Sequence, residues 1–89
     1  MPVLLIAEAN LTEEVYAGIA GQMTPHIRAA KGFICHAGGP NPAGGWRVVE
    51  IWESEDDGQN WFDHNIKPNL PPGVVPKHTY YPLHAAVTK

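Results

Sequence analysis

The most constraining feature of this 89-residue chain is the segment 46–53, which alternates as a β-strand and carries large apolar side chains on both faces. One face would hold Trp46, Val48, Glu50 and Trp52, and the other Arg47, Val49, Ile51 and Glu53. A strand with two apolar faces is covered on both sides. Helices can cover one face, but a chain of this length cannot also supply a second sheet. The segment therefore predicts a partner subunit, and hence a homodimer.

The first half of the chain predicts a strand, a helix and a second strand. Residues 3–8 form a β-rich run, and Thr12 can cap an amphipathic helix with two glutamates in its first turn. Pro25 is expected to end or kink this helix near residues 22–24, because proline cannot continue the hydrogen-bond ladder. Residues 32–37 then form the second strand.

The second half repeats this pattern around residues 46–53. The Gly-rich segment 38–45 predicts a hairpin loop and a candidate lid for a pocket, and Ser54 predicts the N-cap of a second helix. Residues 77–88 predict a final strand. Pro82 confines that strand to an edge of the sheet, or bends it there, because proline cannot donate to a ladder.

The resulting order is β-α-β-β-α-β, which predicts one ferredoxin-like α+β domain over residues 1–89. Its four-stranded antiparallel sheet would carry both helices on one face. We expect the strands at 3–8 and 46–53 in the centre, with the strand at 77–88 beside the strand at 32–37. On that arrangement His36 and His78 would be neighbours on the sheet.

Composition narrows the class of protein. The net charge is −3, and the six lysines and arginines are spread along the chain without a basic stripe, so nucleic-acid binding has little support. Cys35 is the only cysteine, which allows no intrachain disulfide and suits a reducing compartment. The N-terminal apolar run at 3–7 is too short for a signal peptide or a membrane span. These features predict a cytoplasmic protein without a membrane partner.

Several short motifs resemble one known group of proteins. Residues 50–54 form an E-x-W-x-S strand end, followed at once by an acidic helix start and an aromatic, His-bearing helix. This pattern resembles the dimeric α+β barrel superfamily, which includes antibiotic biosynthesis monooxygenases. The segments 44–50 and 81–84 look like its small uncharacterised bacterial members. The resemblance covers nearly the whole chain, and it implies a homodimer with a pocket between sheet and helices in each subunit.

The branches of this superfamily imply different chemistry. Cofactor-free monooxygenases bind flat phenols beside Asn, Trp and His groups, for which this chain offers Asn10, Trp52, Trp61 and His64. Haem-degrading members place the haem-ligating His about ten residues after a helix Trp, where this chain has Pro71, so haem has poor support. We therefore expect no cofactor. Cyclase-like members use a His and Tyr pair as acid and base.

His36, His78 and Tyr80 are the candidate catalytic residues. His78 and Tyr80 share one strand face, and a neutral imidazole beside a phenol can exchange protons near neutral pH. A hydrogen-bonded core histidine is an equally good reading of His36 and His78. A one-residue slip in register would turn His36 to the other face of the sheet. No zinc spacing is present, so no metal site is predicted.

Tyr16, Trp52, Trp61 and His64 are the candidate substrate-binding residues. Tyr16 and Trp61 would form walls from the helices, although packing in the core and dimer interface is the commoner role of tryptophan. On a helical wheel, His64 lies far from the apolar side of its helix, which favours a position facing solvent.

Two further side chains have open readings. Glu50 would either pair across the dimer, with Arg47 or Arg28 of the partner as candidates, or carry a raised pKa in a pocket. Cys35 reads as a small buried apolar residue.

The sequence leaves three hypotheses for function. One is a cofactor-independent enzyme, of monooxygenase or cyclase/isomerase type, acting on a small aromatic or polyketide-like molecule. The second is a dimer that binds a small molecule without catalysis, and the third is a structural dimer.

Overall fold

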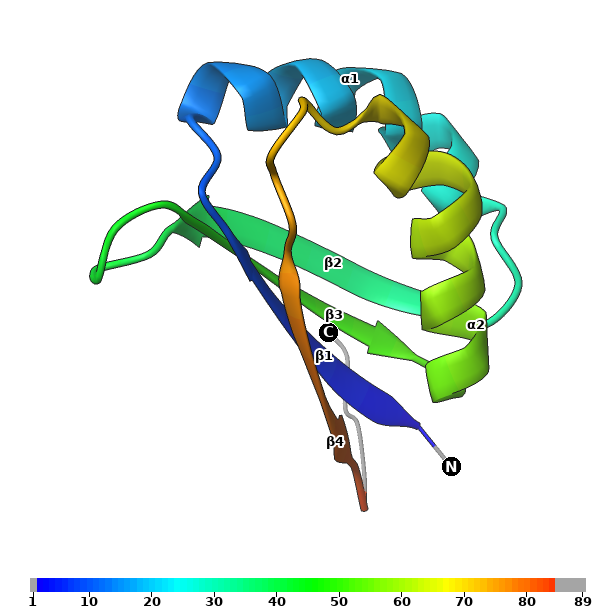
Figure 1. The fold of residues 1–89 in the computed structure, drawn as a ribbon. Coiled ribbons are helices and arrows are strands. Elements are labelled where there is room, and N and C mark those ends of the chain that lie inside the picture. The colour runs from blue at the N-terminus through cyan, green and yellow to red at the C-terminus, as the bar shows by residue number, and fades with distance from the viewer. Residues whose placement is uncertain (1, 85–89) are drawn as a thin grey trace.

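A four-stranded antiparallel sheet carries two helices on one face in the computed structural model, which describes residues 2–84 (Figure 1). The main elements are β1 (Val3–Ala9), α1 (Glu13–Arg28), β2 (Phe33–Pro40), β3 (Trp46–Trp52), α2 (Glu55–Trp61) and β4 (Lys77–Pro82). A π-helical turn (Phe62–Ile66) and a short 3₁₀ turn (Lys67–Asn69) extend α2. The predicted β-α-β-β-α-β order and ferredoxin-like α+β fold are confirmed.

The strands lie in the order β2-β3-β1-β4. β1 and β3 are central, as expected, but β4 pairs with β1. The expectation that it would lie beside β2 was wrong. Both crossovers, β1-α1-β2 and β3-α2-β4, must be right-handed, and with the helices on one face this sends β4 away from β2. His36 and His78 therefore lie on opposite edge strands, separated by β3 and β1.

The two helices begin where the sequence predicts. The Thr12 hydroxyl accepts a hydrogen bond from the Val15 amide at 3.2 Å, and the Ser54 hydroxyl accepts one from the Asp57 amide at 3.1 Å. These are N-cap bonds of the usual kind.

The expected end of α1 near Pro25 was wrong, because the helix continues to Arg28. Because proline has no N–H, the carbonyl of Gly21, four residues before it, has no hydrogen-bond donor in the helix. Pro25 and Gly21 are both exposed, so water can supply the missing hydrogen bond. The last turn is held instead by burial of Ile27, which is 8% exposed.

Strand ends also differ from the expected ones. β2 runs to Pro40 instead of residue 37, so the hairpin loop shortens to residues 41–45. β4 ends at Pro82, beyond which the predicted strand has no regular structure at residues 83–84, and residues 85–88 lie outside the described part. As predicted, β4 is an edge strand.

The core lies at one end of the sheet, under α2. Ile27, Trp52 and Trp61 form its buried centre, and Trp52 is fully buried. Gly58 of α2 allows this packing, because a Cβ there would stand only 3.0 Å from Cδ1 of Trp52. No helix within residues 2–84 is long and apolar enough to cross a membrane.

The sheet face turned away from the helices is apolar. Leu4 pairs with Ile51 and Ile6 with Val49, and all four have the strand parity opposite to that of the helix-facing Leu5 and Glu50. No element of residues 2–84 covers this face in Figure 1. The sequence pattern at 46–53 therefore corresponds to a strand with one face under helices and one open face.

Candidate functional site

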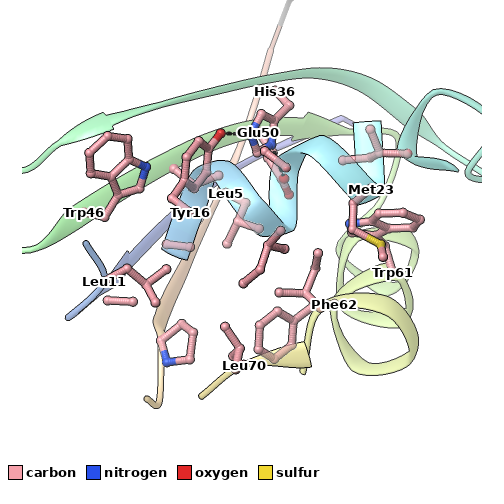
Figure 2. Close-up of a pocket in the computed structure, with 18 of the residues that line it drawn as sticks. Leu5, Leu11, Tyr16, Met23, His36, Trp46, Glu50, Trp61, Phe62 and Leu70 are labelled. Carbon is pink, nitrogen blue, oxygen red and sulfur yellow. Dashed lines mark hydrogen bonds and ion pairs between the residues drawn. The ribbon is translucent and has the colours of Figure 1, made fainter. Parts of the chain in front are cut away.

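A pocket lies between the helix-facing side of the sheet and the two helices, with a cavity volume of about 110 Å³ (Figure 2). Most of its lining is apolar: Leu5, Ala7 and Val48 from the sheet, Ile19 and Met23 from α1, and Phe62, Ile66 and Leu70 from the segment after α2. The π-helical turn supplies Phe62 and Ile66, and turns of this kind are frequent at functional sites. Four titratable groups interrupt this surface, Tyr16, His36, Glu50 and His78, and Thr24 adds a hydroxyl.

A β-bulge directs His36 into the pocket. Phe33 pairs with Trp52, but Cys35 pairs with Ile51, so the register shifts by one residue between them. Because of the shift, Phe33 and His36 share the helix-facing side although they are three residues apart, whereas regular alternation would put them on opposite faces. Cys35 turns to the outer face, where it is half-buried.

Tyr16, His36, Glu50 and Trp52 form one continuous chain of hydrogen bonds, which we call the relay. His36 Nδ1 lies 2.6 Å from Glu50 Oε2, and His36 Nε2 lies 2.6 Å from the Tyr16 hydroxyl. Trp52 Nε1 donates to the other carboxylate oxygen, Glu50 Oε1, at 2.9 Å. Figure 2 shows Tyr16 reaching from α1 to meet His36 over the sheet.

The hydrogen bonds of the relay allow its proton positions to be assigned. The Glu50 side chain is 9% exposed and that of His36 is 28% exposed. An ionised carboxylate only accepts hydrogen bonds, so with Glu50 ionised and the imidazole neutral we assign the ring proton to Nδ1. Nε2 then holds a lone pair and accepts from Tyr16. Both carboxylate oxygens of Glu50 have partners within the chain, His36 and Trp52, and Glu50 lines the pocket, so the structure favours the reading of Glu50 as a pocket carboxylate.

Gly38 gives Tyr16 its place over the sheet. A Cβ on Gly38 would stand 2.5 Å from the Tyr16 hydroxyl oxygen, so any side chain there would displace the phenol. Burial, and then the charge of Glu50, raise the pKa of Tyr16, which keeps its hydroxyl protonated and able to donate to His36.

His78 and Tyr80 are not part of the relay that contains His36. His78 lines the pocket from the other edge strand, with its ring edge-on to Phe62 at 4.3 Å between centroids. Tyr80 does not line the pocket, and its hydroxyl donates to Gln59 at 3.1 Å. Burial and three nearby carboxylates raise the pKa of Tyr80 to about 12, so it is a poor base at neutral pH. His36 and His78 do share one sheet face.

Two of the four predicted substrate-binding residues line the pocket and two do not. Tyr16 and Trp61 line the pocket, as does Trp46. Trp52 is fully buried behind it and holds Glu50. His64 is exposed and outside this pocket, and its Nδ1 bonds to the Asn60 carbonyl at 2.8 Å. Asn10 is exposed in the turn after β1 and does not line the cavity.

Sequence reasoning missed the relay because it placed the hairpin loop at 38–45. With the observed loop at 41–45, antiparallel counting from Pro40 opposite Trp46 puts His36 directly opposite Glu50. That pairing was the available signal. Within residues 2–84, no cluster of three His, Cys, Asp or Glu side chains could hold a metal ion.

No family model and no curated protein matches the sequence. Solved structures do match over nearly the full chain. SnoaB from Streptomyces nogalater, a cofactor-independent oxygenase solved in a mutant form, has a TM-score of 0.70 at 9% identity, covering 99% of this chain and 98% of its own. A candidate antibiotic biosynthesis monooxygenase from Deinococcus radiodurans has a TM-score of 0.65 at 12% identity, covering 100% and 98%. The heme-degrader MhuD from Mycobacterium tuberculosis, solved with two hemes in its active site, has 0.58 at 15%, covering 97% and 99%.

The chain has the fold of the antibiotic biosynthesis monooxygenase-like proteins. This confirms, at the level of fold, the resemblance read from residues 50–54 and from the order of elements. At these identities the likeness carries the fold alone, and the chemistry of this pocket has to be argued from its own residues.

The pH dependence of stability tests whether His78 is buried in the folded chain. Burial outweighs two nearby carboxylates and lowers the pKa of His78 below its ordinary 6.5, so below that pH the unfolded chain binds more protons than the folded one. We expect the urea midpoint of unfolding to decrease as the pH is lowered from 7.5 to 5.5, and to decrease less in His78→Asn than in the wild type. In His64→Asn, which removes an exposed histidine, the midpoint should decrease as much as in the wild type. Equal falls in His78→Asn and wild type would contradict the assignment.

Proposed function

We propose that this protein is a cofactor-independent enzyme of monooxygenase type that oxidises a small phenolic molecule with O₂. One observation carries the proposal: a Glu50–His36–Tyr16 relay ends in an otherwise apolar, aromatic-walled pocket. A histidine oriented by a buried carboxylate is a general base held in one tautomer. The fold shared with an oxygenase supports the reaction class by analogy.

The relay would act by moving one proton from the substrate to His36. The substrate hydroxyl gives its proton to the Tyr16 oxygen while Tyr16 passes its own proton to His36 Nε2. The products are a phenolate and an imidazolium ion, and the buried Glu50 carboxylate stabilises that new positive charge. Concerted transfer suits the raised pKa of Tyr16, because the tyrosinate ion is avoided.

The phenolate is rich enough in electrons to react with O₂ directly. One oxygen atom enters the ring and the other leaves as water, so that a phenol and O₂ give a quinone and water. The substrate is oxidised and O₂ is the oxidant. The ring carbon that gains oxygen loses its C–H hydrogen as a proton, and this proton and the one on His36 both end on the reduced oxygen as water. The apolar walls keep bulk water from the ring anion.

The test is O₂ uptake with a panel of one-ring and two-ring phenols, followed by detection of the quinone. Loss of a positioned acid–base group typically costs about 10²–10⁴-fold in rate. We expect His36→Asn and Tyr16→Phe each to reduce kcat by about 10²-fold or more. His64→Asn, which changes an exposed histidine outside the pocket, should retain wild-type kcat.

Two results would reject the proposal. In the first, His36→Asn oxidises phenols as fast as the wild type. In the second, the wild type binds phenols but consumes no O₂ with any of them, and that outcome favours a non-catalytic binding protein.

We also propose that two copies pair through the open sheet face. Leu4, Ile6, Val49 and Ile51 form a continuous apolar surface across the two central strands, and an uncovered surface of this kind marks an association site. Tyr81, 47% exposed on β4, extends it. The same surface cannot be covered by the helices, which occupy the other face.

Sedimentation velocity checks this pairing. The wild-type chain should sediment as a dimer at micromolar concentration, and Val49→Glu, which places a charge in the middle of the surface, should shift it to monomer. Gln22→Glu, which adds a charge at an exposed site on α1 and therefore on the other side of the sheet, should remain dimeric. A wild-type monomer at these concentrations would overturn the proposal.

A further inference from the structure

The proposed oxidation releases two protons, and the relay is placed to take only the first. The relay meets the substrate at its hydroxyl oxygen, through Tyr16 and His36. The second proton leaves a different atom, the ring carbon that gains oxygen. Glu50 cannot take it, because both of its carboxylate oxygens are engaged by other side chains of the relay. The reaction therefore calls for a second base on another wall of the pocket.

His78 has the properties that such a base needs. Among the described residues that line the pocket, it is the one titratable group outside the relay. Within residues 2–84, neither of its ring nitrogens has a hydrogen-bond partner, and neither is sealed from solvent as the indole nitrogens of Trp46 and Trp61 are. Burial lowers the pKa of His78, against the opposing effect of Glu50 and Asp63, so at neutral pH the ring keeps a lone pair that can accept a proton.

The register of the sheet places His78 across the pocket floor from the relay. One row of paired residues crosses all four strands: Gly38, Val48, Ala7 and His78. The Tyr16 hydroxyl lies at the Gly38 end of this row, 2.5 Å from the point where a Cβ on that glycine would stand. The middle of the row, Val48 and Ala7, lines the pocket.

This row determines how a phenol would lie in the pocket. The strands at its two ends are three spacings, about 14 Å, apart, so the relay and His78 border the floor from opposite sides. A phenol whose hydroxyl meets Tyr16 extends its ring over Val48 and Ala7, in the direction of His78. His78 therefore lies on the side of the ring carbons, and the relay lies on the side of the hydroxyl.

We propose that His78 is the second base of the oxidation, a catalytic residue that removes the proton from the ring carbon that has gained O₂. The inference rests on the proposed function. O₂ adds to the phenolate to form a peroxide on that carbon, and its terminal oxygen takes the proton held by His36. His78 then takes the C–H proton, the C–H electron pair becomes the second bond of the new carbonyl, and the O–O bond breaks. The departing hydroxide takes the proton from His78, which gives the quinone and water.

Single turnovers with the fastest substrate of the phenol panel test this role. Three events are followed separately: phenolate formation without O₂, O₂ uptake, and appearance of the quinone. We expect His78→Asn to form the phenolate and take up O₂ as the wild type does, but to form the quinone about 10²-fold or more slowly, because a positioned base is lost. Deuterium on the ring carbons should slow quinone formation in this variant further. His64→Asn, which changes an exposed histidine outside the pocket, should match the wild type throughout.

Two results with this variant would overturn the inference. One is quinone formation at the wild-type rate in His78→Asn. The other is a His78→Asn protein that binds the phenol but no longer forms the phenolate, since His78 would then act in the first step. Failure of the proposed function looks different, because the wild type itself would then take up no O₂ with any phenol.

A second measurement uses the wild type and needs no variant to fold. Phenol, added without O₂, should shift the ¹⁵N–¹H correlations of the His78 ring and leave those of the His64 ring unchanged. Binding of phenol without a shift at His78 would also overturn the inference, because a base that removes a proton from the substrate has to contact it.

Discussion

The buried carboxylate of Glu50 is the group on which this site depends. A carboxylate that is 9% exposed is costly to desolvate unless hydrogen bonds satisfy its oxygens. Trp52 satisfies one oxygen and His36 the other. The folded chain therefore holds a negative charge at one fixed point under the helices, and the orientation of His36 follows from it.

The relay continues outward from Glu50 through contacts that only small residues allow. Gly58 lets α2 lie against Trp52, which fixes the indole that donates to Glu50. At the other end, Gly38 leaves the space that the Tyr16 phenol occupies above β2. Core packing under α2 and the chemistry at the pocket are thus parts of one connected arrangement, so a change at either glycine should alter the position of His36.

The sequence was sufficient for the order of helices and strands because local signals agreed with one another. Thr12 and Ser54 cap helices as their chemistry predicts, and the alternation in 46–53 identifies the central strand. Strand order could not be read locally, because β4 is placed by the handedness of a crossover. The length of α1 could not be predicted from local signals either, because burial of Ile27 stabilises the helix beyond Pro25.

The site was harder to predict because it depends on register. His36 was identified, but its partner was not, because Glu50 is brought opposite it by a hairpin loop shorter than expected. The bulge between Phe33 and Cys35 sends His36 inward, and nothing in the composition of that segment indicates it. Tyr80, chosen by alternation with His78, shares its face but bonds to Gln59 outside the pocket.

The central claim is that His36 is a neutral imidazole with its proton on Nδ1, held by Glu50, and a free lone pair on Nε2. Long-range ¹⁵N–¹H correlation spectra of the histidine rings test it directly, with His36 assigned by comparison with His36→Asn. At pH 7.5 the account predicts that Nδ1 of His36 is protonated and Nε2 is not, and that Glu50→Gln disturbs this state. A His36 ring protonated on Nε2 alone, or on both nitrogens, at that pH would contradict it.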